Sequence, residues 1–263
     1  NLADVIDEAI LNRISSDLVA SIEDDLSSRE DWEDTYKTGL EFLGMKTEER
    51  TEPFEGSSGV IHPLLAESVT QFQAQAYREL LPATGPVRTQ VVGAQNEMLV
   101  KQAERVKDYM NYMITYEMEE YDPELDQMLF YLPVTGSTFK KVYFDPLKGR
   151  AVSKFLHAED IIVPYGATDL LSSPRITHRL TMDSNEIKKL QLNGFYRDVD
   201  VPDSQYGGEY GGSQIEESID DVQGVHPSGP SEDITLYEVH TSLDIEGFED
   251  IGVDGMPSGL KLT

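Results

Sequence analysis

The sequence predicts an α+β protein with a helical amino-terminal half, a mainly antiparallel β-rich region and an acidic flexible insertion. Three observations support this fold class. Apolar residues recur every three or four positions up to about residue 135. Short alternating segments separated by turn residues follow. Residues 198–233 then combine ten acidic residues and six glycines with no Lys or Arg. Helices followed by strands, rather than alternating with them, are typical of α+β domains.

Composition excludes several classes of protein. Of 263 residues, 39% are hydrophobic, and 13 Tyr and 9 Phe are among them, which favours a folded core. The absence of cysteine excludes disulfides, thiolate catalysis and Cys-based zinc sites. No stretch approaches the roughly 18–20 apolar residues of a membrane span, and no secretory signal opens the chain.

The net charge is −28, from 21 basic and 49 acidic residues. Such a surface repels a nucleic-acid backbone, because affinity for phosphates comes from Lys and Arg side chains that replace counterions. Any DNA partner should therefore pass by the protein without being gripped. Simple solubility is an equally open explanation of the charge.

The first helical region covers residues 15–45, where apolar side chains recur every three or four residues. The S-x-x-E pattern of Ser27–Glu30 has the form of a capping box. We therefore expect two helices, the second of which starts near Ser27 or Ser28 and stops at Gly44.

A loop over residues 46–62 precedes the next helix. Pro63 opens that helix, because the missing N–H of proline would have no partner at the first helical position. Pro82 ends the helix, and the alternation over residues 87–91 predicts a short strand.

Residues 95–120 predict a long helix with a broad apolar stripe that includes Tyr109 and Met113. For the Tyr/Met part of this stripe, residues 109–118, core packing is the favoured interpretation, and a partner or ligand face is the alternative. A further helix begins at Asp122, as an Asp cap followed by proline, and ends near 133–136.

The β-rich region starts after residue 136. A turn with Pro and Gly at 145–149 forms a hairpin, and a short helix that stops at Gly194 precedes the acidic insertion. The segments with strand character are 137–144, 150–156, 160–164, 175–182 and 234–245.

The stretch EGSSGVIHPLL, residues 55–65, raises the question of catalysis. A phosphate-binding loop would need G-x-x-x-x-G-K-[ST], but Gly56 and Gly59 lie three apart and no Lys follows. A nucleophile elbow needs G-x-S-x-G, and EGSSG is one residue too short. Ser58 and His62 have no evident acidic partner, so we interpret His62 as a residue of the turn that leads into a helix.

Metal binding has equally little support. None of the five histidines forms an i, i+4 pair, and His178 and His240 fit structural positions in strands. The acidic clusters at 23–25 and 219–221 lack the spacing of a calcium loop. We expect no catalytic residue, no cofactor and no dedicated metal site, so a metal-assisted hydrolase is the weakest alternative.

Four sequence pieces do point to a family. SREDWEDTYKTGLEFLG, EGSSGVIHPLL and FQAQAYRELLPATGPVRTQVVG occur in this order between residues 28 and 93. Residues 136–190 then contain a hairpin, an AEDIIV strand and the segment RITHRLTMDSNEIKKL. As a set covering roughly residues 16–195, these pieces resemble the portal, or head–tail connector, proteins of tailed bacteriophages, most closely those of short-tailed phages.

The resemblance implies a division of the chain. Residues 1–136 would be the helical part of the portal wing, 137–197 a β-rich wing subregion, 198–233 the acidic flexible insertion and 234–263 a β-strand continuation. We expect the chain to be the amino-terminal, wing-containing part of a longer polypeptide, which ends before the stem and clip.

The resemblance also implies a structural function without enzymatic activity. Portal subunits form a homo-oligomeric ring, typically of twelve, at the unique capsid vertex, through which double-stranded DNA is packaged and ejected. Implied partners are terminase, tail adaptor proteins, the major capsid protein and DNA that passes without sequence-specific binding. The implied location is the virion, after assembly in the host cytoplasm and without a membrane. Another ring-forming virion protein, such as a head–tail adaptor, is the alternative.

Side-by-side packing of subunits in a ring requires apolar residues on helices to meet a neighbour. Our candidates for this subunit interface are Trp32, Tyr36, Tyr109 and Met113.

Overall fold

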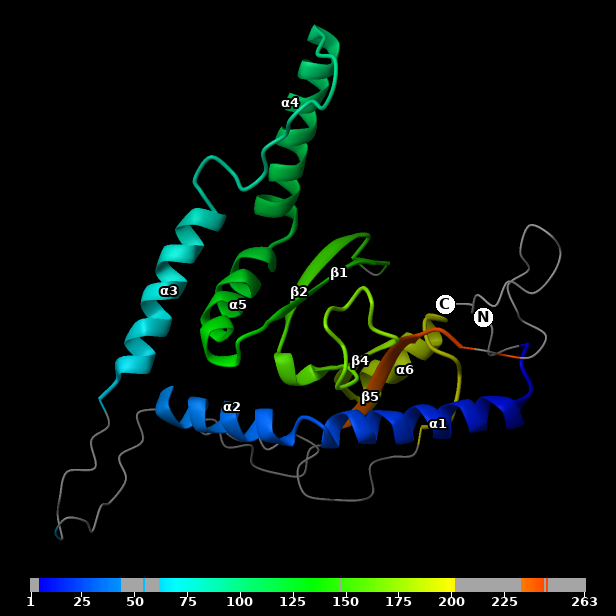
Figure 1. The fold of residues 1–263 in the computed structure, drawn as a ribbon. Helices are drawn as coiled ribbons and strands as arrows, with labels where there is room; N and C mark the ends of the chain where they lie inside the picture. The colour runs from blue at the N-terminus through cyan, green and yellow to red at the C-terminus, as the bar shows by residue number, and fades with distance from the viewer. Residues whose placement is uncertain are drawn as a thin grey trace. The chain divides into compact units, whose positions relative to one another are not determined.

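A computed structural model describes residues 5–43, 54, 62–146, 148–201, 233–243 and 245. It confirms the α+β prediction, since a helical amino-terminal half precedes strands in two small antiparallel sheets (Figure 1). The chain forms two compact units, residues 1–37 with 159–263 and residues 38–158. Each unit combines helix and sheet, whereas the predicted division at residue 136 follows the type of element. Most of the acidic insertion 198–233 lies outside the described residues.

The first unit is built on a three-stranded antiparallel sheet in the order β3-β4-β5. Strands β4 and β5 pair along nine residues, from Arg175 opposite Thr241 to Asp183 opposite Asp233. The interior contains Ile22, Ile162 and Ile187. The elements are α1 (Glu8–Ser27), the start of α2 (Glu30–Leu43), β3 (Ile161–Ile162), β4 (Arg175–Asp183), α6 (Ser184–Leu192) and β5 (Asp233–Thr241).

The predicted break between two amino-terminal helices is confirmed, but the capping differs. Helix α1 starts at Glu8, earlier than predicted, because the Asp7 side chain accepts a hydrogen bond from the Ala9 amide at 2.9 Å. The Ser28 hydroxyl donates to the Asp25 carbonyl at 2.7 Å. Ser28 therefore completes the end of α1 and does not cap α2.

The second unit packs helices against a two-stranded hairpin. Helix α5 contacts both α3 and β2, and Leu125 and Leu129 on α5 are buried together with Val69 on α3 and Val152 on β2. Its elements are the end of α2, α3 (Leu64–Leu80), α4 (Glu97–Tyr112), the π-helical turn η2 (Met113–Glu117), α5 (Tyr121–Thr135), β1 (Phe139–Asp145) and β2 (Arg150–Leu156).

The predicted strand at 87–91 is wrong. The segment is extended but pairs with a helix instead of a strand. The Asn111 side chain accepts from the Val87 amide at 2.9 Å and donates to the Val87 carbonyl at 3.2 Å. A side-chain amide offers the same donor and acceptor as a backbone peptide group, so Asn111 takes the place of a partner strand.

The long helix predicted over 95–120 has two parts. Helix α4 ends at Tyr112, and the π-helical turn follows, in which the Met118 amide bonds to the Met113 carbonyl at 2.8 Å. The next helix, predicted from Asp122 to 133–136, is confirmed as α5. Gly136 ends α5 in the left-handed conformation, with φ of 78°.

Predicted strands correspond to β1, β2, β3, β4 and β5, although β3 is only two residues long because Ala158–Asp160 form a 3-10 turn. The hairpin turn is confirmed by the hydrogen bond from the Gly149 amide to the Asp145 carbonyl, at 2.8 Å. The short helix before the insertion is confirmed as α6, Ser184–Leu192.

Candidate subunit interface

Of the histidines considered for catalysis or metal binding, His178 and His240 share one acidic neighbour, Glu238. His62 is exposed just before α3, and Ser58 lies outside the described residues. His178 is buried on β4, and its Nδ1 atom lies 3.8 Å from a carboxylate oxygen of Glu238. His240 is exposed and also contacts Glu238, at 2.8 Å. Within the described ranges, no group of three or more His, Asp or Glu side chains could hold a metal ion.

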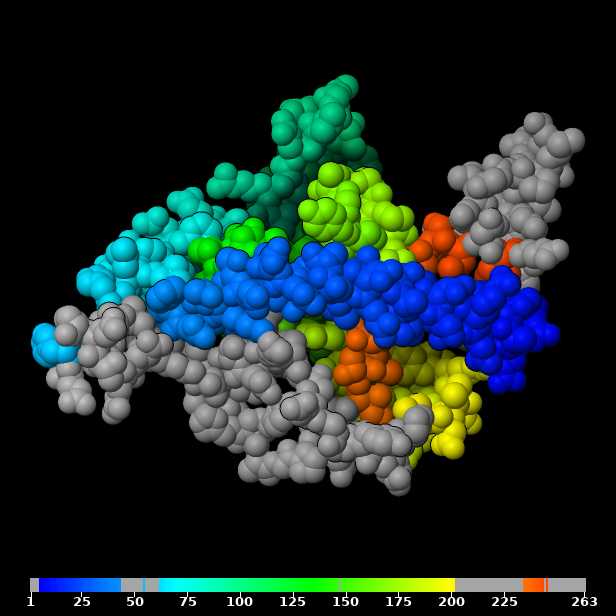
Figure 2. All heavy atoms as spheres, turned by 60° about the horizontal axis from the view of Figure 1, so that its bottom comes forward, coloured from blue at the N-terminus to red at the C-terminus, as the bar shows by residue number. Residues whose placement is uncertain are grey.

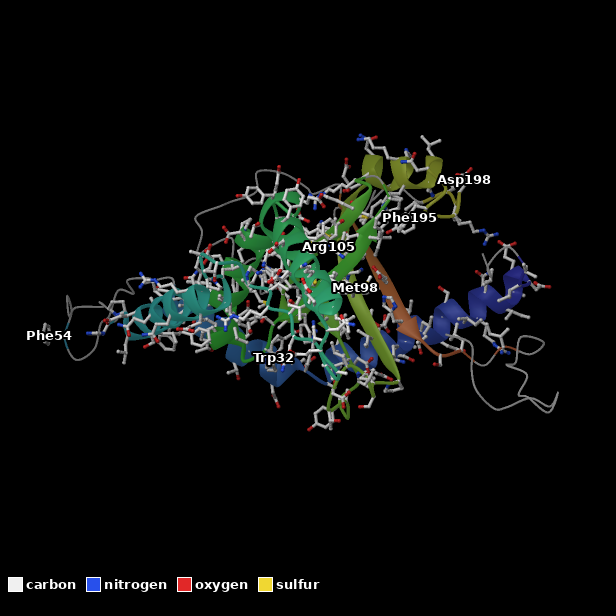
Figure 3. All side chains as sticks on the ribbon, turned by 90° about the horizontal axis from the view of Figure 1, so that it is seen from above. Trp32, Phe54, Met98, Arg105, Phe195 and Asp198 are labelled. Atoms are coloured by element: carbon white, nitrogen blue, oxygen red, sulfur yellow. The ribbon has the colours of Figure 1, made fainter. Side chains whose placement is uncertain are left out.

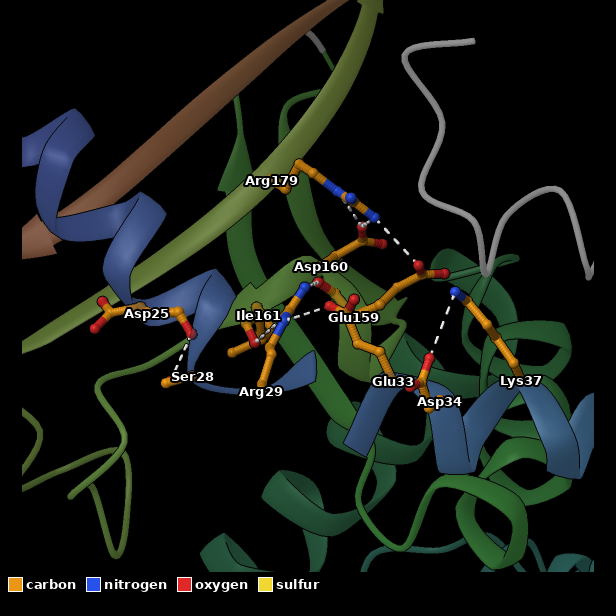
Figure 4. Close-up of polar contacts among 10 residues, drawn as sticks. All are labelled: Asp25, Ser28, Arg29, Glu33, Asp34, Lys37, Glu159, Asp160, Ile161 and Arg179. Carbon is orange, nitrogen blue, oxygen red and sulfur yellow. Dashed lines mark hydrogen bonds and ion pairs between the residues drawn. The ribbon is translucent and has the colours of Figure 1, made fainter. Parts of the chain in front are cut away.

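Buried charges in the first unit form a network around Arg29, at the junction of α1 and α2 (Figure 4). Arg29 donates to the backbone carbonyls of Glu159 and Ile161, at 2.7 and 3.3 Å, and to the Glu33 carboxylate at 2.7 Å. Burial lowers the pKa of Arg29. All three acceptors belong to the protein itself, so Arg29 holds the helix junction to the segment before β3.

Arg179 on β4 extends this network. Its guanidinium lies 3.2 Å from the buried Glu159 carboxylate and 3.1 Å from that of Asp160. A separate ion pair joins Arg175 on β4 to the buried Asp25 on α1, at 2.5 Å. Asp25 is part of the acidic cluster 23–25, and its pairing with Arg175 gives that residue a structural role. Buried carboxylates in this unit are paired with arginines, which suits stability more than acid–base chemistry.

Helix α4 differs from these paired elements, because none of its residues is buried. With about 3.6 residues per turn, five exposed apolar side chains fall on one side of the helix. Met98 is 76% exposed and Tyr109 60% exposed; Figure 3 labels Met98 and Arg105 on this helix. We call this set the α4 apolar face; its members are Met98, Leu99, Val106, Tyr109 and Met110.

The charges of α4 lie mainly on the other side of the helix. Three basic residues balance three acidic ones, so the helix is neutral in a chain of net charge −28. One pair, Lys101 and Glu97, forms a salt bridge at 2.6 Å. An apolar, neutral helix is a part of this molecule that another acidic protein can approach with little repulsion. The charged residues are Glu97, Lys101, Glu104, Arg105, Lys107 and Asp108.

The four interface candidates occupy different environments. Tyr109 belongs to the α4 apolar face, and Met113 is half-buried in the following π-helical turn. Tyr36 is only 2% exposed and packs against Trp32, with ring centroids 5.5 Å apart. Tyr36 is therefore buried and offers no surface to a partner. The Trp32 ring is half-buried and lies under the Arg29 guanidinium, 5.9 Å from its centroid.

Core packing, the interpretation favoured for the Tyr/Met stripe 109–118, is wrong for the part of the stripe on α4, where Tyr109, Met110 and Tyr112 are exposed. The methionines and the isoleucine of the stripe after α4 are half-buried. The sequence pattern identified an apolar side, but the exposure of Met98, Leu99 and Val106 was not anticipated. The segment before α4 contacts the helix through two hydrogen bonds, from the Val87 amide to the Asn111 side chain at 2.9 Å and from the Thr89 hydroxyl to the Ala103 carbonyl at 3.0 Å.

Comparison with known proteins does not identify the chain. No protein-family profile matches it, and no curated protein matches it significantly. Among the described residues, no helix is both long enough and apolar enough to span a membrane.

Proposed function

We propose that this chain is the wing-containing part of a phage portal protein, a subunit of the ring at the capsid vertex through which double-stranded DNA is packaged and ejected. Terminase and tail adaptor proteins would dock on that ring. The proposal begins with the ordered set of sequence pieces between residues 16 and 195 that resemble portal proteins.

The observation that carries the proposal is the α4 apolar face. Exposed apolar side chains that gather on one side of a helix mark a surface for another protein. Side-by-side packing of identical subunits in a ring would cover such a face in every copy. The buried charges around Arg29 and Arg179 are paired with one another or with backbone carbonyls. This pairing fits a structural subunit, because the groups of this network are used in contacts within the protein.

The charge of the chain supports the same function. A portal conducts DNA without holding it, and a net charge of −28 disfavours contact with phosphates. Both units would then form the wall of the ring, and the ring would not select a DNA sequence.

Electron microscopy and native mass spectrometry of the purified full-length protein test this proposal. We expect closed rings of about twelve copies with a central channel, at protein concentrations in the micromolar range. A protein that stays monomeric across this range would contradict the proposal. Rings that bind a tail protein but not terminase would favour a head–tail adaptor instead.

A further inference from the structure

The β1–β2 hairpin has the opposite charge to the rest of the chain. Residues 139–156 carry five basic side chains and one acidic one, Asp145. When the hairpin is left out, 16 basic and 48 acidic side chains remain. The basic residues are Lys140, Lys141, Lys148, Arg150 and Lys154.

Part of this charge is used within the second unit. Arg150 makes two parallel hydrogen bonds to the Glu120 carboxylate, at 2.7 and 2.8 Å. Lys140 lies over the Tyr121 ring, with Nζ 3.7 Å from its centroid. Lys148 and Lys154 are exposed. The hairpin therefore keeps a basic surface after its internal pairs are formed.

The two edges of the hairpin differ in how their outward-facing amides are hydrogen-bonded. At the β2 edge, the Phe155 amide donates to the Glu124 carboxylate at 2.6 Å, and the Ser153 backbone hydrogen-bonds to the Glu120 carboxylate. Glu120 and Glu124 lie one turn apart at the start of α5. Two acidic side chains at this spacing on one helix thus satisfy the outward-facing amides of a strand.

The β1 edge also has amides that point outward, but no described strand pairs with them. Val142 pairs with Ser153 and Lys140 with Phe155. Because opposed residues of an antiparallel pair direct their backbone groups either both inward or both outward, the amides of Lys140 and Val142 point away from β2. In the described parts of the chain, no strand pairs with this edge.

Apolar side chains accompany the open edge. Val142 and Phe144 project on the same side of β1, and each is 66% exposed. Pairing between two β1 edges from separate copies would bring lysines against lysines, which is unfavourable. The edge therefore suits a partner that carries acidic and apolar groups.

We infer that the open edge of β1 docks the acidic outer face of α1 and α2 from a second copy of this chain. The inference rests on the proposed function, because it requires that copies assemble. Residues 8–37 contain nine acidic and three basic side chains. In the view of Figure 2, the side chains of α1 form a continuous surface that faces the reader.

Helix α2 offers a pair of acids with the spacing that α5 uses. Glu30 and Asp34 are four residues apart, as Glu120 and Glu124 are, and both are exposed, Asp34 to 81% of its side chain. Carboxylates at these positions can accept from the Lys140 and Val142 amides while the lysines neutralise them. A hairpin that binds a different surface on the next copy makes a head-to-tail contact, the type that closes into rings.

Charge reversal in the full-length protein tests the inference. Lys148→Glu with Lys154→Glu should raise the concentration of half-assembly roughly tenfold or more, since complementary charges at an interface become repulsive. The matched control is Lys188→Glu with Lys189→Glu on α6, which changes net charge equally on another exposed surface. The control variant should assemble like the wild type, and thermal unfolding should confirm that both variants fold.

The reciprocal change distinguishes docking from a general charge effect. Adding Glu30→Lys and Asp34→Lys to the hairpin variant should restore assembly to within about threefold of wild type. Hydrogen exchange should show protection of the Lys140 and Val142 amides only in the assembled state. Normal assembly of the hairpin variant would overturn the docking site. Failure of the α2 change to restore assembly would also overturn the docking site, provided that the wild type still forms rings. Absence of rings from the wild type would instead overturn the proposed function and the docking site with it.

Discussion

Arg29 donates a 2.7 Å hydrogen bond to the backbone carbonyl of Glu159, a residue 130 positions later in the chain. The contact fastens the junction between α1 and α2 to the segment that leads into β3. Because Arg29 also bonds to the Ile161 carbonyl, it supplies donors to two carbonyls in the interior of the first unit.

Replacing Arg29 with alanine should lower the free energy of unfolding by about 2–4 kcal/mol, since the Glu159 and Ile161 carbonyls lose a charged donor. Urea denaturation measures the change. The control is Arg13→Ala, because Arg13 is an exposed basic residue on the same pair of helices. A loss from Arg29→Ala no larger than that from the control would show that the network contributes no net stability.

The Arg150–Glu120 pair predicts a specific dependence on pH. Hydrogen bonds from Arg150 lower the pKa of Glu120 from its ordinary value of 4.5 to about 2. A lowered carboxyl pKa stabilises the folded state above pH 4.5, and this contribution is lost as pH falls from 4.5 toward 2. In Glu120→Gln this part of the acid dependence should be absent.

Urea midpoints between pH 2 and 6 test this prediction by difference between wild type and variant. Glu119→Gln is the control, because Glu119 is the exposed neighbour of Glu120. The wild type and Glu120→Gln should differ above pH 4.5 and converge at lower pH. A constant difference at every pH would contradict the assignment.

Alanine substitutions at two glycines distinguish the cost of a close contact from the cost of backbone strain. Gly85 and Gly93 both have positive φ, 93° and 97°. A Cβ atom at Gly85 would lie 2.5 Å from the Asn111 side-chain oxygen, whereas nothing lies within 4 Å of one at Gly93. Gly85→Ala should therefore displace the side chain that holds Val87.

We expect Gly93→Ala to cost about 1–2 kcal/mol from φ alone and Gly85→Ala at least about 1 kcal/mol more. Calorimetry of both variants provides the comparison. In an Asn111→Ala background the excess cost at Gly85 should disappear. Equal costs in the wild-type background would mean that Asn111 does not hold the 87–91 segment.

The α4 apolar face predicts loss of assembly without loss of folding. Val106→Asp and Tyr109→Asp place a charge where a neighbouring subunit would bury apolar surface, so each should abolish rings while the unfolding free energy changes by less than about 1 kcal/mol. Sedimentation velocity and thermal melts measure the two effects. Asn185→Asp, which adds the same charge on exposed α6, should assemble normally. Rings formed by both α4 variants would exclude this face from the interface.

His62 should prove unimportant. It is exposed ahead of α3 and belongs to no catalytic cluster in the described residues. His62→Ala should assemble and package DNA at wild-type levels. A packaging defect in protein that still forms rings would give His62 a role that the structure does not explain.

Local pattern predicted most of the elements in this fold. Apolar periodicity located α1 to α4, and capping and turn residues located α5, the hairpin and α6, because these signals depend on neighbouring residues. The strand at 87–91 failed for a non-local reason, since the group that pairs with Val87 is the Asn111 side chain, 24 residues away. Alternation alone cannot show whether a strand or a side chain provides the partner.

The candidate interface could be predicted only in part. The stripe through Tyr109 showed that α4 has an apolar side, but periodicity does not show whether an apolar side meets the core or another molecule. Tyr36 has the same pattern and is buried. The partners of Arg29 and Arg175 could not be predicted either. The chain has 49 acidic residues, and their spacing in the sequence does not indicate which carboxylate pairs with which arginine.

Imaging of the particles expected under the proposed portal function is the most direct test of that function. The proposed function predicts a single ring of about twelve copies at one capsid vertex, with a channel that contains DNA. An antibody against the chain should mark that vertex alone. Labelling confined to the tail, or labelling at many vertices, would contradict it.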